Sequence, residues 1–328
     1  MSEPLVRADK LSRAFPARGG LPLFGKRRSI RAVTDVDLTV ARGETVGLVG
    51  ESGSGKSTIG RMVLGLSRPT AGTVRFDGID VAAADPATLR ALRRRMQLVF
   101  QDPYSSLDPR RRIGAQIADG LDIHGLLPPK DRPARVAELL AAVGLRPEHA
   151  ERHAHAFSGG QRQRIGIARA LATNPDFIVA DEPVSALDVS VQAQVLALLE
   201  DLRARLGLAM LFISHDLPAV RHLCDRVVVL YLGRVMEEGP TAEVFGNPRH
   251  PYTRALLSAA PSLDPARRRR RDILMGEPPS PADPPSGCVF RTRCRFATAD
   301  CAAVVPPLET VGPDHRAACI RLDAVGEA

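Results

Sequence analysis

Hydrophobic and polar positions in residues 1–245 alternate between a strand pattern and a helix pattern. Short, nearly continuous apolar runs at 44–50, 176–181, 209–214 and 227–233 predict buried strands, because parallel strands are covered on both faces. Residues 36–40 alternate instead, as a half-buried strand does. Between the second and third runs, one helical face carries the apolar residues Val191, Val195, Leu198, Leu199, Leu202 and Leu206. Strands that alternate with helices predict an α/β fold with a parallel sheet.

Two later segments depart from this alternation. No buried-strand run interrupts residues 106–157, and the apolar residues there follow helical spacing: Val136, Leu139, Leu140 and Val143. We therefore expect a helical insert. After residue 246 prolines become dense, and proline interrupts helices and strands alike. This composition predicts a linker that leads to a small irregular module.

Composition narrows the setting without deciding the function. The 328 residues include 45 Lys and Arg against 37 Asp and Glu, a net charge of +8. This balance suits a solvated arginine-rich surface, nucleic acid or an anionic membrane, and arginines cluster at 93–95, 110–112 and 267–271. No apolar run approaches the roughly 20 residues of a membrane helix, and the N-terminus lacks a secretory signal pattern. We expect a cytoplasmic chain, in which disulfides are rare.

The stretch GESGSGKST at 50–58 matches the phosphate-binding pattern G-x-x-x-x-G-K-[ST]. A strand pattern precedes it and a helix pattern follows, so backbone N–H groups and the helix N-terminus are expected to face phosphate oxygens. Lys56 is expected to neutralise the β- and γ-phosphates, and the Ser57 hydroxyl to bind Mg²⁺. We assign nucleotide binding to Gly50, Ser52, Gly53, Ser54, Gly55, Lys56, Ser57 and Thr58.

Two acids end the apolar run in FIVADEP. Asp181 follows the run directly and is expected to hold Mg²⁺ through water. Glu182 points to the opposite face of the strand, and we assign it as the general base that activates the attacking water.

The stretch FSGGQRQRIGIARAL at 157–171 begins with a capping box formed by Ser158 and Gln161. The adjacent Gly159 and Gly160 favour close approach of the backbone to a ligand. With these motifs in order, the chain resembles the nucleotide-binding subunits of ATP-binding-cassette (ABC) transporters, whose signature is SGGQ. The resemblance implies a P-loop NTPase (RecA-like) core with an antiparallel β subdomain and a helical subdomain, plus a small irregular C-terminal cysteine module.

The resemblance also implies roles for particular residues. Ser158 and Gly160, with the rest of the signature, would bind the γ-phosphate of ATP held on the phosphate loop of a partner cassette. Gln101 matches the residue that senses the transporter and binds Mg²⁺. His215 matches the histidine that contacts the γ-phosphate and positions water. Asp188 matches the acid of the dimer-contact loop.

The aromatic residue that stacks on adenine is assigned to Phe15 by the same resemblance. Phe24 is an alternative, because PARGGLPLFGKRRS intervenes after the first strand pattern.

Longer stretches, including QDPYSSLDPR, VSALDVSVQ and RHPYTRALLSAAP, resemble the dipeptide and oligopeptide importers, and more closely their second ATPase chain. On this basis residues 1–246 would form the nucleotide-binding domain, with its helical subdomain at about 106–160, and residues 247–328 the importer extension. The partners would be a second, homologous ATPase, two membrane permeases and, indirectly, an extracytoplasmic solute-binding protein. The chain would then lie at the cytoplasmic face of the membrane.

Other family members remain alternatives. Importers of nickel or another small solute share this resemblance. A DNA-repair cassette would suit the positive charge, but only residues 59–156 separate the phosphate loop from the signature, where repair proteins carry long insertions. The HPYTRALL stretch argues against an exporter.

Cys288, Cys294, Cys301 and Cys319 gather four of the five cysteines near the C-terminus, with the spacing C-x₅-C-x₆-C-x₁₇-C. In a reducing compartment such thiols bind metal more often than they pair. The spacing fits neither a zinc knuckle nor a compact ferredoxin run, so zinc and iron–sulfur stay open. The resemblance favours a [4Fe–4S] cluster with a structural role, with Zn²⁺ as the alternative. We expect Cys224 to be buried, and His149, His153 and His155 to be solvated.

Overall fold

The computed structural model describes residues 3–16, 29–259 and 276–326, and the chain divides into two compact units. Unit 1 consists of Met1–Val6, Thr39–Thr45 and Arg75–Ser214. Unit 2 consists of Arg7–Leu38, Val46–Val74 and His215–Ala328. Each unit therefore closes its core with segments that lie far apart in the sequence.

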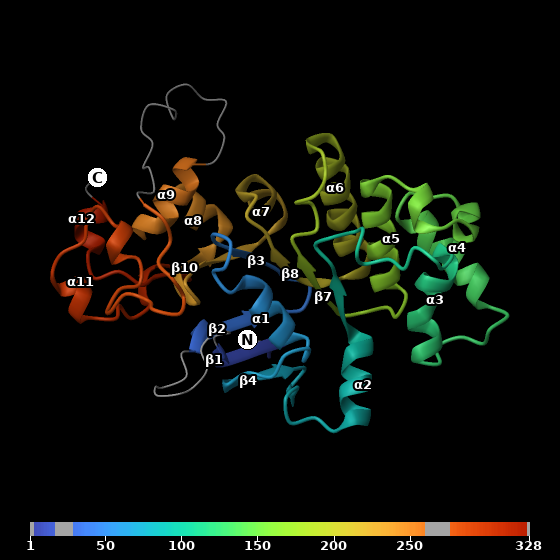
Figure 1. The fold of residues 1–328 in the computed structure, drawn as a ribbon, viewed down its shortest axis with the longest axis horizontal. Coiled ribbons are helices and arrows are strands. Elements are labelled where there is room, and N and C mark those ends of the chain that lie inside the picture. Colours follow the sequence, from blue (N-terminus) through green and yellow to red (C-terminus); the bar gives the residue numbers. More distant parts are fainter. Residues whose placement is uncertain (1–2, 17–28, 260–275, 327–328) are drawn as a thin grey trace, which may run out of the picture. The chain divides into compact units, whose positions relative to one another are not determined.

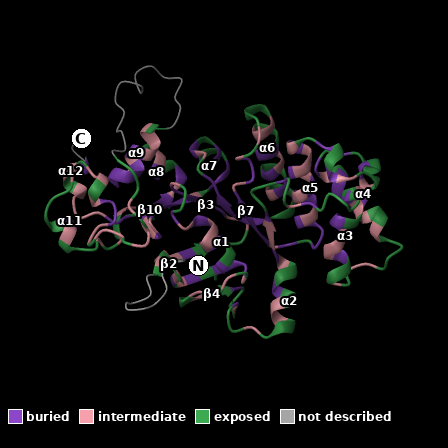
Figure 2. Ribbon diagram, viewed as in Figure 1, coloured by how far each residue is buried: buried purple, intermediate pink, exposed green. Residues whose placement is uncertain are grey.

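The sheet of unit 1 is parallel. Strand β7 (Phe177–Asp181) pairs with β6 (Met96–Val99) on one side and with β8 (Ala209–Ile213) on the other. Every residue of β7 and β8 is buried, and β7 appears purple in Figure 2. Burial on both faces explains why these strands are apolar at successive positions, and the predicted strands at 176–181 and 209–214 are confirmed.

Helices account for the rest of unit 1. The predicted helical segment contains α3 (Ile113–Ile123), α4 (Arg132–Ala142) and the 3₁₀ helices η1 (Pro147–Glu151) and η2 (Ala154–Ala156). Helices α3 and α4 pack on each other and on α5 (Gly159–Leu171), as Figure 1 shows. Unit 1 also contains β5 (Ile79–Asp80), α2 (Pro86–Arg95) and α6 (Val189–Leu206).

The face predicted for α6 is correct in its middle. Val195, Leu199 and Leu202 are buried, whereas Leu206 is 56% exposed because the helix ends there, at a left-handed Gly207.

Unit 2 has its own parallel pair. Strand β3 (Thr45–Val49) aligns with β9 (Arg226–Tyr231), so that Val49 lies opposite Val229. Strand β10 (Arg234–Pro240) runs antiparallel to β9, and α1 (Lys56–Val63) follows β3. The other helices of the unit before the linker are α7 (Leu217–Leu223), α8 (Thr241–Gly246) and α9 (Pro251–Ala259).

A separate sheet holds β2 (Ser29–Val40), β1 (Val6–Pro16) and β4 (Ala71–Phe76) in that order. The polarity pattern predicted only residues 36–40 of it.

The C-terminal segment (residues 276–326) differs from the irregular module that the sequence predicts. Its strand β12 (His315–Ala317) pairs with the edge of β10, placing Ala317 opposite Glu237, and β11 (Glu309–Gly312) pairs with β12. The edge strand β10 gains a partner for its backbone groups in this way. The remaining elements of the segment are η3 (Arg291–Arg293), α11 (Asp300–Ala303) and α12 (Leu322–Gly326).

A buried carboxylate fastens this pairing. Glu237 is fully buried and accepts hydrogen bonds from the backbone N–H groups of Arg249 (2.6 Å) and His250 (3.0 Å). Its Oε1 also lies 2.8 Å from Nε2 of His315 in β12. Such a group is tolerated inside a protein only when donors surround it, so Glu237 ties the start of α9 and the C-terminal segment to β10.

The pH dependence of stability follows from His250, which is also buried. Burial lowers the pKa of His250 to about 4, although Glu237 and the Ala318 backbone oppose the shift. Between pH 6.5 and about 4 the unfolded chain binds a proton that the folded chain does not. We expect the free energy of unfolding to fall by up to about 3 kcal/mol as the pH is lowered through this window, as measured by denaturant titration.

The variant His250→Asn is the matched control. Asparagine can accept the Tyr252 N–H that Nδ1 of His250 now accepts at 3.0 Å, but it does not titrate. The variant should show a shallower pH dependence below 6.5, and equal slopes in both proteins would contradict the assignment to His250.

Candidate functional site

The predicted phosphate loop connects β3 to α1 in unit 2, and steric contact explains its glycines. A Cβ at Gly50 would lie 2.2 Å from the carbonyl oxygen of Leu230, and one at Gly55 would lie 2.3 Å from that of Ala32. Gly53 and Gly55 also have φ values of +78° and +103°, which favour glycine. Close backbone approach therefore requires glycine at Gly50 and Gly55, while glycine at Gly53 avoids the strain of a positive φ.

Lys56 lies over the loop rather than in solvent. Its Nζ donates to the carbonyl oxygens of Gly50 (2.7 Å) and Glu51 (3.0 Å), and the residue is 5% exposed. Ser54 is buried, and its carbonyl oxygen accepts from the N–H of Gly233 beyond β9. The loop thus holds its own lysine at the N-terminus of α1, where Ser57 and Thr58 form the first turn.

The predicted acids lie in unit 1, at the end of β7. Asp181 is the last residue of the strand and is buried. Glu182 has a φ of +46°, which is unusual for a residue with a side chain, and its N–H donates to the Ile213 carbonyl oxygen. Its Oε2 accepts a 3.0 Å hydrogen bond from Nε2 of Gln101. Two residues predicted from separate motifs, Gln101 and Glu182, are therefore in contact.

Backbone strain of this kind concentrates at functional sites, because packing elsewhere must hold it in place. Glycine would relieve it, so retention of a carboxylate here is consistent with a chemical role for Glu182.

The capping box predicted at the signature is confirmed. Ser158 Oγ accepts from the Gln161 N–H (3.4 Å), and Gln161 Oε1 accepts from the Ser158 N–H (3.1 Å), at the start of α5. A Cβ on Gly160 would lie 2.2 Å from Cγ1 of Val191, whereas Gly159 has only ordinary contacts. Packing against α6 is thus sufficient reason for Gly160, and ligand approach stays a prediction.

The remaining predicted residues fall at element ends. Asp188 is the N-cap residue of α6, and His215 stands between β8 and Asp216, the N-cap residue of α7. Phe15 lies in β1 with the Arg13 guanidinium 4.7 Å above its ring. Phe24 lies outside the described residues.

Sequence reasoning missed one set of contacts at the phosphate loop. The Glu51 backbone N–H donates to Oη of Tyr252 in α9 at 2.9 Å, and its carboxylate accepts from Nη1 of Arg293 at 2.6 Å. No local pattern relates these three positions, so nothing in the sequence pointed to them.

The four C-terminal cysteines lie in one segment. The Cys288 N–H donates to the Cys301 carbonyl oxygen at 2.8 Å. Burial raises the pKa of Cys288 and Cys294, and burial with the neighbouring cysteines raises that of Cys319 to about 11. Among the described residues, no group of three or more His, Cys, Asp or Glu is arranged to hold a metal ion. The predicted [4Fe–4S] cluster therefore has no support from this arrangement.

The other cysteine and the histidines can be placed as well. Cys224 is buried at the end of α7, as predicted. The prediction that His149 is solvated is wrong: it is buried edge-on against Phe157, with ring centroids 5.3 Å apart, and burial lowers its pKa. Its contact with Phe157, the residue that follows η2, accounts for this. His153 and His155 stack on each other.

The chain is similar to known proteins along nearly its whole length. Residues 33–185 match the ABC transporter family, and residues 236–301 match the oligopeptide/dipeptide transporter C-terminal region. An ATP-binding protein of Brucella ovis named for peptide import is 59% identical over 318 residues, 97% of this chain and 98% of its own length. The dipeptide transport ATP-binding protein DppF of Escherichia coli is 46% identical over 323 residues, 98% and 96% of the two chains. The chain belongs to the ABC transporter family.

A solved structure supports the fold of this ABC ATPase. The ATP-binding cassette MJ0796, in a dimeric post-hydrolysis state bound to ADP and Pi, is 31% identical, with a TM-score of 0.63. The match covers 72% of this chain and 98% of that one. ATP and Mg²⁺ are accordingly its expected ligands. In the described part of the ABC ATPase, no helix combines the length and apolar character needed to cross a bilayer.

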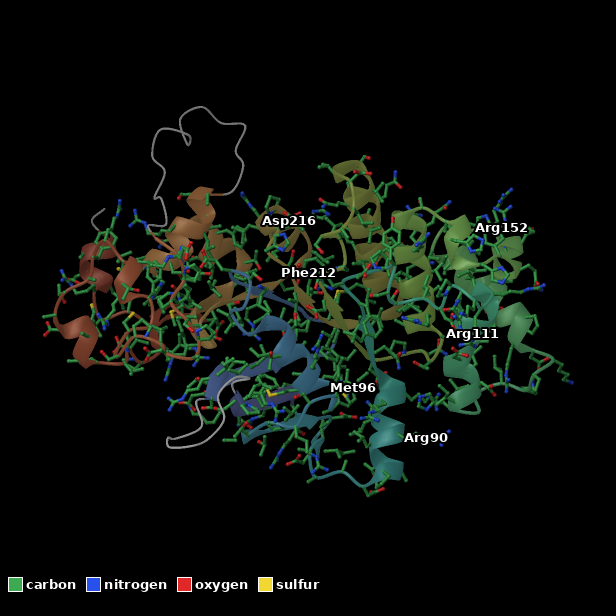
Figure 3. The ribbon with its side chains drawn as sticks, in the orientation of Figure 1. Arg90, Met96, Arg111, Arg152, Phe212 and Asp216 are labelled. Carbon is green, nitrogen blue, oxygen red and sulfur yellow. The ribbon has the colours of Figure 1, made fainter. Side chains whose placement is uncertain are left out.

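Three arginines of the clusters at 93–95 and 110–112 pair with acids of unit 1: Arg95, Arg111 and Arg112. Arg111, labelled in Figure 3, donates to both carboxylate oxygens of Asp119 at 2.7 and 2.8 Å. Arg95 lies between Asp77 (2.8 Å) and Asp176 (2.6 Å). These contacts favour the solvated-surface interpretation over a nucleic-acid site. The cluster at 267–271 lies outside the described residues.

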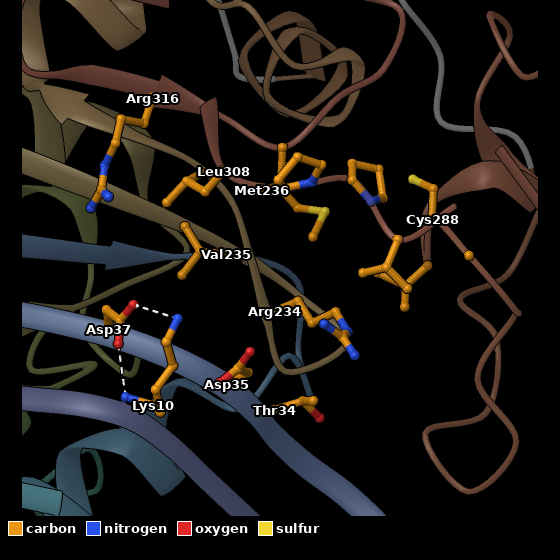
Figure 4. A pocket seen from close by; sticks show the side chains of 16 residues that line it. Lys10, Thr34, Asp35, Asp37, Arg234, Val235, Met236, Cys288, Leu308 and Arg316 are labelled. Atoms are coloured by element: carbon orange, nitrogen blue, oxygen red, sulfur yellow. Dashed lines mark hydrogen bonds and ion pairs between the residues drawn. The ribbon is translucent and has the colours of Figure 1, made fainter. Parts of the chain in front are cut away.

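A pocket of about 380 Å³ in unit 2 of the ABC ATPase is not the predicted nucleotide site. Figure 4 shows Lys10 and Asp37 paired at 3.1 Å on one side of it and Cys288 on the other. None of the residues predicted to bind nucleotide lines it, so the pocket offers no alternative to the phosphate loop.

The variant Glu182→Gln tests the general-base assignment. Glutamine keeps an oxygen that can accept from Gln101 but cannot take a proton from water, so nucleotide should still bind while hydrolysis in the assembled transporter falls about 100-fold or more. Phosphate release and binding of a fluorescent nucleotide measure the two effects separately.

Lys56→Ala provides the contrast. It removes the ammonium group from the loop and should weaken nucleotide binding itself. Turnover like the wild type in Glu182→Gln would show that another group activates the water.

Proposed function

We propose that this ABC ATPase powers the import of dipeptides or oligopeptides through a membrane transporter. The observation that carries the proposal is the extent of the likeness: relatives named for peptide import match across at least 97% of the chain, including the C-terminal region. Neither alternative, a DNA-repair ATPase or an importer of nickel or another small solute, is favoured by these relatives.

The phosphate loop is proposed to bind the ATP phosphates. N–H groups of the loop and of the first turn of α1 would donate to phosphate oxygens. Lys56 would move from the Gly50 and Glu51 carbonyl oxygens to the phosphates and neutralise part of their negative charge. The loop fits this task because its glycines accept the close approach of the neighbouring strands without a steric clash. Ser57 and Asp181, with Gln101, would hold Mg²⁺, which draws charge from the phosphates when it is bound.

The hydrolytic step is proposed to use Glu182 and His215. Glu182 Oε accepts a proton from water as the water oxygen forms its bond to the γ-phosphorus and the bond to the β,γ-bridging oxygen breaks, giving ADP and Pi. Gln101 orients the carboxylate through its 3.0 Å hydrogen bond. His215 would orient the water or the γ-phosphate, and Phe15 would stack on adenine.

A complete site is proposed to need a second chain, because this sequence holds one phosphate loop and one SGGQ signature. Residues 158–161 of one subunit would face ATP on the loop of a homologous ATPase, with Asp188 at the contact between them. ATP-driven closure of this pair would act on two permeases at the cytoplasmic face of the membrane, and a solute-binding protein would deliver the cargo.

Reconstitution tests the function directly. The chain, the partner ATPase and the permeases encoded with it should accumulate peptide in vesicles when ATP and the cognate binding protein are supplied on their proper sides. ATP hydrolysis by the isolated chain should be slow and be stimulated by the partners. Full activity in a strictly monomeric preparation, or a binding protein that retains nickel and no peptide, would refute this assignment.

The four cysteines are proposed to hold a [4Fe–4S] cluster, with Zn²⁺ as the alternative. Four thiols in one segment suit either a [4Fe–4S] cluster or Zn²⁺. The segment is too small to build a large core, so a bound metal would help to fold it. The raised pKa values of Cys288, Cys294 and Cys319 mean that these thiols must release protons on binding, and the four side chains must converge beyond their present arrangement.

Protein purified without oxygen provides the measurement. We expect a brown preparation with about four irons and four sulfides per chain. A colourless protein with one zinc per chain would identify the other metal, and a metal-free, folded protein would show that the thiols serve neither.

A further inference from the structure

The second residue of the phosphate loop, Glu51, is held from outside the loop at both its backbone and its side chain. Its N–H donates to Tyr252 Oη, and its carboxylate accepts from Arg293 through two parallel bonds, Nη1 to Oε2 (2.6 Å) and Nη2 to Oε1 (3.1 Å). Its carbonyl oxygen accepts from Nζ of Lys56, the residue expected to meet the phosphates. Glu51 therefore links the C-terminal segment to the lysine of the loop.

The forked geometry and burial make this a strong contact. The Arg293 side chain is 5% exposed and that of Glu51 is 25% exposed, so solvent screens the pair only weakly. Burial opposes the charge of Arg293, but the hydrogen bonds with Glu51 and Tyr231 prevail and raise its pKa above the ordinary value. A planar guanidinium that donates two bonds to one carboxylate fixes direction as well as distance.

Arg293 is itself held firmly. It ends the short helix η3, immediately before Cys294, and its guanidinium lies 5.8 Å from the ring centroid of Tyr231. Phe290, three residues earlier, packs on Tyr231 and Tyr252 with ring centroids 5.3 and 5.2 Å apart. These aromatic contacts place Arg293 against β9, the strand that pairs with β3 immediately before the phosphate loop.

The charge of Glu51 gives this contact a consequence for nucleotide binding. A carboxylate in the loop repels the phosphates that the loop has to accept, and an arginine beside it offsets that repulsion. Arg293 also restrains the Glu51 backbone, whose carbonyl oxygen accepts from Nζ of Lys56. Without it, the loop keeps a negative charge and loses one of its anchors.

We propose that Arg293 is a positioning residue of the phosphate loop, which acts through Glu51 and makes nucleotide affinity depend on correct docking of the C-terminal segment. The proposal rests on nucleotide binding at the loop and is independent of the cargo. It assigns to the segment that carries the cysteines a role in the ATPase site of its own chain.

The test measures binding of a fluorescent ATP analogue to the full chain in a double-mutant cycle. Arg293→Gln should raise the dissociation constant on the order of tenfold, because it exposes the Glu51 charge and releases the loop. The double variant Glu51→Gln/Arg293→Gln lacks the unpaired carboxylate. It should therefore bind the nucleotide analogue more tightly than Arg293→Gln, with a dissociation constant between those of Arg293→Gln and the wild type. Losses that multiply in the double variant would show that the two residues act independently.

Arg291→Gln is the matched control. Arg291 lies in the same short helix, but its guanidinium donates to Ser286 within the C-terminal segment, so this variant should bind nucleotide like the wild type. An equal loss in Arg291→Gln and Arg293→Gln would mean general damage to the segment and would overturn the proposal.

Conservative variants keep the test decisive if Arg293→Gln does not fold. Arg293→Lys and Glu51→Asp retain both charges but break the fork, so each should weaken binding about two- to threefold and raise the KM for ATP with little change in kcat. Unchanged affinity in both would overturn the proposal. A wild-type chain that bound no nucleotide would instead refute the ATPase assignment.

Discussion

The predicted phosphate loop depends on strand backbone that approaches its glycines too closely to leave room for side chains. A Cβ at Gly50 would clash with the carbonyl oxygen of Leu230, and a Cβ at Gly55 would clash with the carbonyl oxygen of Ala32. These oxygens belong to β9 and β2, so the strands themselves shape the loop. A loop confined in this way presents its N–H groups without first having to be ordered, which lowers the entropic cost of binding an anion.

Charged groups with buried partners join the C-terminal segment to the rest of unit 2, beside the aromatic packing of Phe290. The Glu237 carboxylate accepts hydrogen bonds from two backbone N–H groups and contacts His315. Arg316 pairs with Glu238, the next residue of β10. The second attachment is the forked pair of Arg293 and Glu51. A buried ion pair gains little net stability over apolar packing, but the loss of one partner is costly, so such pairs specify one docking geometry.

Glu182 and Gly160 in unit 1 each have a residue type that the backbone or its surroundings help to explain, but for different reasons. Glu182 keeps a carboxylate where its positive φ would favour glycine, which indicates that the side chain has a use. Gly160 lacks a side chain where Val191 leaves no space for one, although its φ is ordinary. The first feature is consistent with chemistry, while the second is explained by helix packing alone. The same signature stretch thus contains residues required for structure beside residues predicted for ligand binding.

The sequence by itself determined the parallel strands β3, β7, β8 and β9, but not β6, together with the helical segment, the phosphate-loop motif and the capping box at Ser158. Each of these depends on residues within a few positions of one another, through burial period, glycine placement or a local hydrogen bond. The tertiary structure alone decided the pairing of β12 with β10, the burial of His149 and the contact between Glu51 and Arg293, which are 242 positions apart. Contacts at such separation leave no periodic signal in one sequence, because they arise only when the folded chain brings distant surfaces together.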